Sequence, residues 1–378
     1  MRIYLDHNAT APLRPEARDA MVAFLGAPSN PSSAHREGAR ARAAVDAARA
    51  DVAALVGAAP GEIVFTSGAT EANNLALRGA LGFAGAAATL VTTAVEHASV
   101  LEPARALAGA RLRVVGVDSA GRVGVEAMRA AATGAALASV GLANGEVGAV
   151  QPVAEIAAAL RPLGVLVHSD AAQAVGRIPV DVRTLGVDVL SLSSHKLGGP
   201  AGVGALWVRP GLRLVPLLVG GPQERGRRAG TESVAAIAGF GAAAREARRR
   251  VAARAGEARA LTDRLWDGLV ARIPDVVRNG PAAEPRLPNT LNVSFPGCAG
   301  ESLVVLLDLS GIAASAGSAC AAGAVEPSHV LLAMGRDATA ARAGLRLSVG
   351  PETTAAEIDR VLDLLPPLVR QVRAGAAA

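Results

Sequence analysis

Short apolar runs alternate with segments of helical periodicity between about residues 60 and 210. The runs have strand length and are apolar on both faces, which is typical of a parallel sheet covered by helices on each side. We therefore predict a mainly parallel, seven-stranded sheet in an α/β domain. Its strands are expected at Glu62–Thr66, Thr89–Thr93, Arg111–Val117, Leu137–Leu142, Val165–Ser169, Val187–Ser193 and Val203–Val208, with helices at Thr70–Leu81, Ser99–Leu107 and Pro152–Leu160.

The pattern changes after this region. A long helical tract over Thr231–Arg272, with an expected break near Gly256, leads to a smaller set of strands and helices. We predict a large domain over 15–255 and a small α+β domain built from 1–14 and 256–378. Its strands are expected at Asn289–Phe295, Gly311–Ser315 and Gly344–Val349, and its helices at Gly300–Leu307, Pro327–Met334 and Thr353–Arg373.

Composition narrows the class of protein. The chain has 378 residues, is 51% hydrophobic and contains two cysteines, so it is long enough for a large core and has no disulfide framework. No apolar stretch is typical of a signal peptide or a membrane span, and we expect a cytoplasmic protein without a membrane partner. The scattered histidines have no neighbouring ligand set, so no metal is expected.

A net charge of +5 raises nucleic-acid binding as an alternative. The arginines are interspersed with acidic residues, however, and the one dense run, Arg245–Arg254, has a helical pattern typical of a solvated face. Aromatic residues make up only 2% of the chain, which leaves few surfaces on which bases could stack. We therefore expect no nucleic-acid partner.

Of the 38 lysine and arginine residues, only Lys196 is a lysine. A chain that uses arginine for every other cation is expected to keep a lysine where an amine must lose its proton and attack a carbonyl. The alternative is the chance survival of a surface lysine. Lys196 follows the apolar strand Val187–Ser193, in the Gly- and Pro-rich loop where open α/β sheets bind ligands. Asp170 ends the preceding strand, and a lysine with a nearby aspartate fits pyridoxal 5'-phosphate, whose ring nitrogen pairs with a carboxylate.

Two further strand ends carry polar groups. Ser67, Gly68 and Thr70 lie between a strand and a helix, where backbone N–H groups can bind a phosphate, although Ser67 or Thr70 could simply cap the helix. His97 follows another strand and could stack on a cofactor or move protons, or it could be an ordinary loop histidine.

The remaining candidates lie in the expected small domain. Cys320 stands among small residues in a loop, where a thiol is free to move and react, and Cys298 lies in a similar turn. Arg346 lies in an apolar strand and could clamp a substrate carboxylate, or it could be a charge on an edge strand.

Together these segments resemble the cysteine desulfurases of the class V pyridoxal-phosphate aminotransferase group. The resemblance runs from Tyr4 to about Gly350, and the Cys320 loop is similar to the longer loop of the nitrogenase and housekeeping iron–sulfur branch. The motifs are YLDHNATAP, SNPSSAH, FTSGATEANNLAL, VEHASVL, NGEVGAVQPV, HSDAAQAVG, SLSSHKLGGPAGVGAL, RRAGTES, PNTLNVSF, ASAGSACAAGAVEPSHVL and LRLSVG.

The resemblance implies a fold type I pyridoxal-phosphate enzyme that forms a homodimer and converts L-cysteine to alanine, passing the sulfur to an acceptor protein such as an iron–sulfur scaffold. Lys196, His97 and Cys320 would be catalytic, with Cys320 receiving the sulfur as a persulfide. Arg346 would hold the substrate carboxylate. The residues implied in cofactor binding are Ala69, Thr70, His97, Asp170, Gln173 (on the phenolic oxygen), Ser193, His195, Lys196 and, from the partner subunit, Thr231.

Three departures from the family pattern affect these expectations. Gly145 stands where relatives usually have an asparagine that would touch the ring oxygen, and Asn144 could partly replace it. Pro222 and Gln223 replace a usual Gly and His, and the chain ends soon after its last predicted helix, where scaffold-docking relatives often have a longer tail. A selenocysteine lyase, another carbon–sulfur β-lyase or an aminotransferase is the alternative with the same cofactor, and none of these needs a loop thiol.

Overall fold

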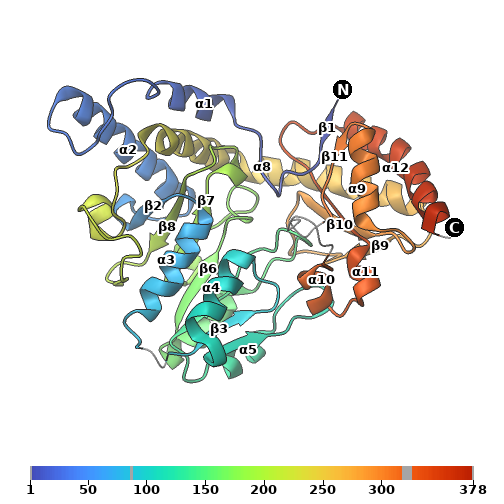
Figure 1. Cartoon of the computed structure of the whole chain (residues 1–378), viewed down its shortest axis with the longest axis horizontal. Coiled ribbons are helices and arrows are strands. Elements are labelled where there is room, and N and C mark those ends of the chain that lie inside the picture. The colour runs from blue at the N-terminus through green and yellow to red at the C-terminus, as the bar shows by residue number, and fades with distance from the viewer. Residues whose placement is uncertain (1, 86–87, 317–325, 377–378) are drawn as a thin grey trace.

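The computed structural model describes residues 2–85, 88–316 and 326–376. Its largest sheet has seven strands in the order β2-β8-β7-β6-β5-β3-β4 (Figure 1). Neighbours from β4 to β7 are parallel, whereas β8 is antiparallel to both β7 and β2. The predicted mainly parallel sheet is confirmed, with strands β2 (Ile63–Thr66), β3 (Leu90–Thr93), β4 (Leu112–Val115), β5 (Leu137–Ser139), β6 (Leu166–Asp170), β7 (Val189–Ser193) and β8 (Gly204–Val208).

Successive side chains of these strands enter different cores, because side chains alternate between the two faces of a sheet. Ile63 and Phe65 pack into one core and Val64 into the other. Both faces are therefore buried, as continuous apolar strands require. The helices of this part are α1 (Pro15–Val22), α2 (Arg36–Leu55), α3 (Ala69–Leu81), α4 (Ala98–Ala108), α5 (Val125–Ala132), α6 (Val153–Leu160) and α7 (Val182–Leu185).

A separate core lies among the C-terminal elements, on the right in Figure 1. The N-terminal strand β1 (Ile3–Tyr4) belongs to it, because it pairs in parallel with β11 (Ile312–Ala313). A second, antiparallel sheet has the order β12-β10-β9. The elements are β9 (Val277–Asn279), β10 (Thr290–Ser294), β12 (Gly344–Ser348), α9 (Gly300–Leu309), α10 (His329–Ala333), α11 (Ala338–Arg342) and α12 (Ala355–Ala376).

One unbroken helix, α8 (Val234–Arg272), joins the two cores, so the expected break near Gly256 is wrong. Phe240 packs in the large core and Leu265 in the C-terminal core. An exposed glycine lowers helix stability by about 1 kcal/mol relative to alanine, which is too little to end a helix anchored at both halves. The domain boundary predicted at 255 falls inside α8 and stays a prediction.

A buried ion pair fixes the segment η5 (Gln223–Gly226) to the large core. The Glu224 carboxylate accepts hydrogen bonds from Nη1 and Nη2 of Arg49, both at 2.7 Å, and from the backbone N–H of Phe65 at 2.9 Å. Both side chains are almost fully buried. Water therefore cannot solvate either side chain of this pair if its partner is removed.

Glu224→Gln is expected to destabilise the protein by about 3 kcal/mol, because it leaves the Arg49 guanidinium buried without its counter-ion. Urea unfolding followed by circular dichroism measures the change. The exposed pair Arg264–Asp359 is the matched control, and Asp359→Asn should leave the unfolding midpoint almost unchanged. Equal midpoints for the two variants would show that the buried pair contributes nothing.

Among the described helices, none is long and apolar enough to cross a membrane.

Candidate active site

The predicted site residues gather where the parallel strands end. His97 follows β3, Asp170 is the last residue of β6, and Ser193 is the last residue of β7. Lys196 lies just beyond, in the short helix η4 (His195–Leu197). Because β3, β5, β6 and β7 are parallel, their carboxyl ends share one edge of the sheet, the usual ligand position in open α/β folds.

A chain of hydrogen bonds links Asp170 to His97. Nδ2 of Asn73 donates to Oδ2 of Asp170 at 2.7 Å and to Oγ of Ser99 at 2.8 Å. Oγ of Ser99 lies 2.7 Å from Nδ1 of His97, which also accepts the Ser99 backbone N–H at 3.1 Å. With Nδ1 accepting, the neutral imidazole carries its proton on Nε2. The exposed ring is therefore fixed in orientation and tautomer.

Lys196 points toward the N-terminal segment. Its Nζ donates to the backbone oxygens of Asn8 at 2.5 Å and Ala9 at 2.7 Å. Burial lowers the pKa of this amine to about 7, helped by the charges of Arg177 and Arg346 and opposed by those of Asp6 and Asp170. A substantial fraction of the amine is therefore neutral, and able to act as a nucleophile, near pH 7, whereas an ordinary lysine is almost fully protonated there.

Gln173 shares an acceptor with Lys196. Its Nε2 donates to the Asn8 backbone oxygen at 3.0 Å. Asn8 in turn donates from Nδ2 to the Gly145 carbonyl at 2.8 Å and to Oγ1 of Thr290 at 2.8 Å. The N-terminal segment is therefore part of the site and connects its large-sheet side to β10.

Helix α3 begins beside the end of β7. Gly68 is its N-cap, and no side chain caps the helix, so the capping alternative for Ser67 and Thr70 is wrong. A Cβ at Gly204, which pairs with Ser193, would lie 2.6 Å from backbone atoms of Gly68. The free N–H groups of the first helical turn and the exposed Thr70 thus adjoin the buried Ser193, as a phosphate site requires.

Arg346 is buried on β12, with 8% of its surface exposed. Its Nη2 donates to Oδ1 of Asp6 at 2.7 Å and its Nη1 to the Gly145 carbonyl at 3.4 Å. Among the residues that the structure describes, none is a hydrogen-bond partner of its Nε. Strand β12 is at the edge of its sheet, but the side chain is not a solvated edge charge. An unpartnered, buried guanidinium N–H is available to a carboxylate.

The remaining predicted residues differ in how close they lie to the site. His195 lies beside the site, where Nδ1 is 3.1 Å from Oγ1 of Thr10, and burial together with the Lys196 charge lowers its pKa to about 4. Thr231 is exposed in the segment before α8, as a residue serving a partner subunit needs to be. Cys320 lies outside the described residues. The other cysteine, Cys298, is buried, and burial raises the pKa of its thiol.

A family model for "Aminotransferase class-V" matches residues 3–361. The chain belongs to this family. A cysteine desulfurase of Cereibacter sphaeroides is 48% identical over 379 residues, covering 99% of this chain and 97% of its own. The resemblance to cysteine desulfurases that the motifs indicated is confirmed.

Solved structures that resemble the chain agree with this assignment. A "NifS-like protein" matches with a TM-score of 0.92 at 36% identity, covering 98% of this chain and all of its own. A structure described as "SspA in complex with cysteine" matches with a TM-score of 0.80 at 32% identity, covering 94% of this chain and all of its own. The predicted fold type I architecture is confirmed.

Sequence reasoning missed several residues that organise this class-V site. Asn73 and Ser99 connect Asp170 to His97, and Asn8 connects Lys196 to Gln173. Asn73 carried a usable signal, because it is a polar residue on the apolar face of α3. Asn8 acts through its backbone oxygen as well as its side chain. Every residue has a backbone oxygen, so such a contact cannot be predicted from the residue type.

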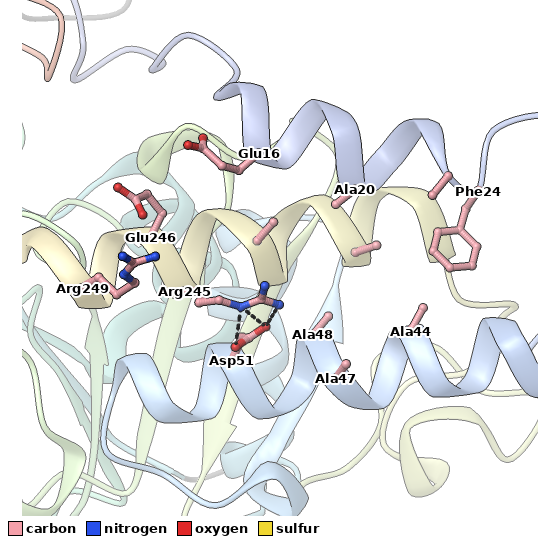
Figure 2. A pocket seen from close by; sticks show the side chains of 13 residues that line it. Glu16, Ala20, Phe24, Ala44, Ala47, Ala48, Asp51, Arg245, Glu246 and Arg249 are labelled. Carbon is pink, nitrogen blue, oxygen red and sulfur yellow. Dashed lines mark hydrogen bonds and ion pairs between the residues drawn. The ribbon is translucent and has the colours of Figure 1, made fainter.

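A groove of about 360 Å³ lies away from these residues, between α1, α2 and α8 (Figure 2). Alanines form much of its wall, and Arg245 pairs with Asp51 across it at 2.6 Å. None of the predicted site residues lines it. The candidate active site is therefore the cluster of polar residues described above, and the larger groove is separate from it.

Proposed function

We propose that the protein is a cysteine desulfurase that uses pyridoxal 5'-phosphate to convert L-cysteine to L-alanine and passes the sulfur to an acceptor through Cys320. The relationship to cysteine desulfurases over nearly the whole chain supports the reaction class. The observation that carries the proposal is the chain's one lysine, held with a lowered pKa near the Asp170 carboxylate at the carboxyl end of the sheet. A cysteine-bound relative of known structure supports the substrate.

The site residues fit the chemistry of this cofactor. Asp170 accepts the Asn73 amide and the Ala172 backbone N–H, which hold an ionised carboxylate in place to pair with a protonated ring nitrogen. The uncapped N-terminus of α3, with Ala69, Thr70 and the nearby Ser193, would bind the phosphate. When bound, the cofactor withdraws electrons from the substrate α-carbon. The ring of His97, fixed by Ser99, would cover the cofactor ring.

Lys196 and Arg346 have complementary tasks toward the substrate. The amine of Lys196 would hold the cofactor through its aldehyde carbon, and at Nζ it would take and return the substrate α-proton. The partnerless Nε of Arg346 would bind the substrate carboxylate, with Nη2 shared with Asp6. His97, with its proton on Nε2, would exchange a proton with the substrate thiol.

Cys320 would attack the substrate sulfur as a thiolate. The new sulfur–sulfur bond forms as the carbon–sulfur bond breaks, and the carbon keeps the electron pair that, with protons, completes alanine. Cys298 is a poor substitute because its thiol is buried and donates to the Val369 carbonyl at 3.6 Å. The persulfide on Cys320 would then deliver sulfur to an acceptor protein.

We also propose that the enzyme is a homodimer. Thr231 is exposed on its own subunit and is expected to reach the phosphate of the partner's site. The nearby ion pair between Arg228 and Glu71, with Nε 2.9 Å from Oε1, ties this segment to the first turn of α3. The segment that carries Thr231 thus has a fixed position on its own subunit, from which an exposed side chain can meet a partner. Light scattering tests the dimer.

The Lys196 amine gives a direct prediction about pH. In the apoprotein, its labelling by an amine reagent should reach half its maximum rate near pH 7, because burial and two arginines disfavour the protonated form. In denaturant the midpoint should rise to about 10.4, the ordinary value for lysine. Peptide mass mapping assigns the label without ambiguity, since the chain has no other lysine. A folded-state midpoint near 10 contradicts the prediction.

The proposed function is tested by adding L-cysteine and a reductant to the purified, cofactor-loaded protein. Equal amounts of alanine and sulfide are expected from the wild type, and neither from Cys320→Ser. Alanine formation that survives in the variant would assign the protein to the lyases that need no thiol. Pyruvate in place of alanine would indicate a different β-elimination reaction.

A further inference from the structure

Arg177 lies just beyond the site and has only neutral hydrogen-bond partners. Its Nη1 donates to the Gln173 backbone oxygen at 3.0 Å and to Oε1 of the same residue, and its Nη2 donates to the His7 backbone oxygen at 3.0 Å. In the described part of the chain, no carboxylate lies within ion-pair distance of it. Holding a partly buried guanidinium without a counter-ion is unfavourable, so its position calls for a functional reason.

The contact with Gln173 fixes which way the amide faces. A guanidinium has donors and no acceptor, so the atom of Gln173 that meets Arg177 must be the amide oxygen. The NH2 group then points the other way, and its Nε2 donates to the Asn8 backbone oxygen that also accepts from Lys196. Arg177 therefore directs the NH2 group of Gln173 toward the side of the site where the Lys196 amine lies.

Gly145 provides the space for this orientation. A Cβ at position 145 would lie 2.5 Å from Nε2 and 2.6 Å from Cδ of Gln173. Real Cβ atoms do not approach other heavy atoms so closely, so a side chain at 145 and this position of Gln173 exclude each other. The absence of a side chain at Gly145 and the presence of Arg177 thus favour the same placement of one amide.

We propose that Arg177 is a positioning residue that locks the Gln173 amide with its NH2 group facing the cofactor, in space that Gly145 leaves free. The inference rests on the proposed function, because Gln173 is the expected partner of the cofactor's phenolic oxygen. An NH2 group donates to that oxygen, whereas a flipped amide would oppose it with a second oxygen. The correctly oriented Gln173 amide then makes the contact with the phenolic oxygen that Gly145, which has no side chain, cannot make.

The charge of Arg177 acts in the same direction. Together with Arg346 it lowers the pKa of Lys196, while Asp6 and Asp170 raise it, and Lys196 in turn lowers the pKa of His195. Arg177 and Lys196 also line a common cavity of about 100 Å³. A fixed cation there disfavours protonation of the lysine and favours an ionised phenolic oxygen.

The test is a cycle of variants with cofactor affinity as the first measurement. Arg177→Met should weaken pyridoxal 5'-phosphate binding about tenfold, the usual loss when a buried polar group faces the wrong partner. In the Gln173→Ala background the same substitution should weaken binding by a clearly smaller factor, because the amide it orients is gone and only the effect of its charge is lost. Equal losses in both backgrounds would overturn the proposal. Arg183→Met is the control, since Arg183 is exposed on α7.

The second measurement is the pH midpoint of the visible absorbance change of the bound cofactor. Arg177→Met should raise this midpoint by about one unit, since removing a cation favours protonation. Arg177→Lys keeps the charge and should leave the midpoint near that of the wild type while still weakening binding. An unchanged midpoint in Arg177→Met would refute the electrostatic part of the proposal.

Gly145→Ala keeps the inference testable if Arg177→Met fails to fold. The added methyl group should displace Gln173 and weaken cofactor binding to a similar extent, with unchanged affinity counting against the proposed contact. The proposed function fails separately, in the wild type, if it neither binds the cofactor nor forms alanine. A functional wild type with normal Arg177 and Gly145 variants overturns the inference alone.

Discussion

Lys196→Ala is expected to abolish alanine formation from L-cysteine, with a loss of at least about 10³-fold. The substitution removes the chain's one lysine, so no neighbouring amine can attach the cofactor or move the α-proton. The visible band of the covalently attached cofactor should disappear with the activity. Turnover assays and absorbance spectra of the purified variant measure both losses.

Lys196→Arg is a companion variant that keeps a long basic side chain. It cannot supply a neutral amine, because a guanidinium does not lose its proton in this pH range. Both variants should be inactive, with circular dichroism spectra like that of the wild type. Substantial activity in either one would remove Lys196 from the chemistry.

Cys320→Ser should stop sulfur transfer, with a loss of about 10³-fold or more, while the visible spectrum of the bound cofactor stays unchanged. A hydroxyl is far less nucleophilic than a thiolate toward sulfur, and the other parts of the site do not need the thiol. Alanine, sulfide and protein-bound persulfide should be measured on the same sample. The persulfide assay locates the sulfur by peptide mass.

The chain supplies its own control in Cys298. This thiol is buried, hydrogen-bonded to the Val369 carbonyl and raised in pKa by burial, so it is expected to be inert. Cys298→Ser should therefore keep activity within about twofold. If it is Cys298→Ser that abolishes persulfide formation, the roles of the two cysteines must be exchanged.

The elements that could be predicted from sequence were those in which the spacing of apolar residues shows which faces are buried. The seven strands of the large sheet were located because their apolar runs match strands with both faces covered, and errors at the ends were a few residues. Helices α1 and α2 were not predicted, and their apolar and polar residues are only weakly segregated onto separate faces. Helix α5 was also missed, although its faces differ clearly. The expected break in α8 is wrong because the prediction considered the local glycine and not the two cores that hold the helix.

In the site, sequence identified side chains that act directly and missed those that act through others. Lys196 stood out by its rarity and Asp170 by its place at a strand end. The roles of Asn8 and Arg177 depend on backbone oxygens brought together from distant parts of the chain, and no pattern of residue types encodes such a meeting. Gly145 was recognised as a departure from the family, but only the geometry shows that Gln173 takes up the space.

The contacts that hold the N-terminal segment have a consequence for biosynthesis. Asp6 and Asn8 are synthesised long before their partners Arg346 and Asn289. Joining segments about 300 residues apart requires a large loop to close, which is a slow step in folding. The nascent chain can complete its large sheet early, but the N-terminal segment that accepts the Lys196 hydrogen bonds cannot be fixed by Asn289 and Arg346 until those residues have been made. The surroundings of the Lys196 amine are therefore completed after the sheet that precedes it.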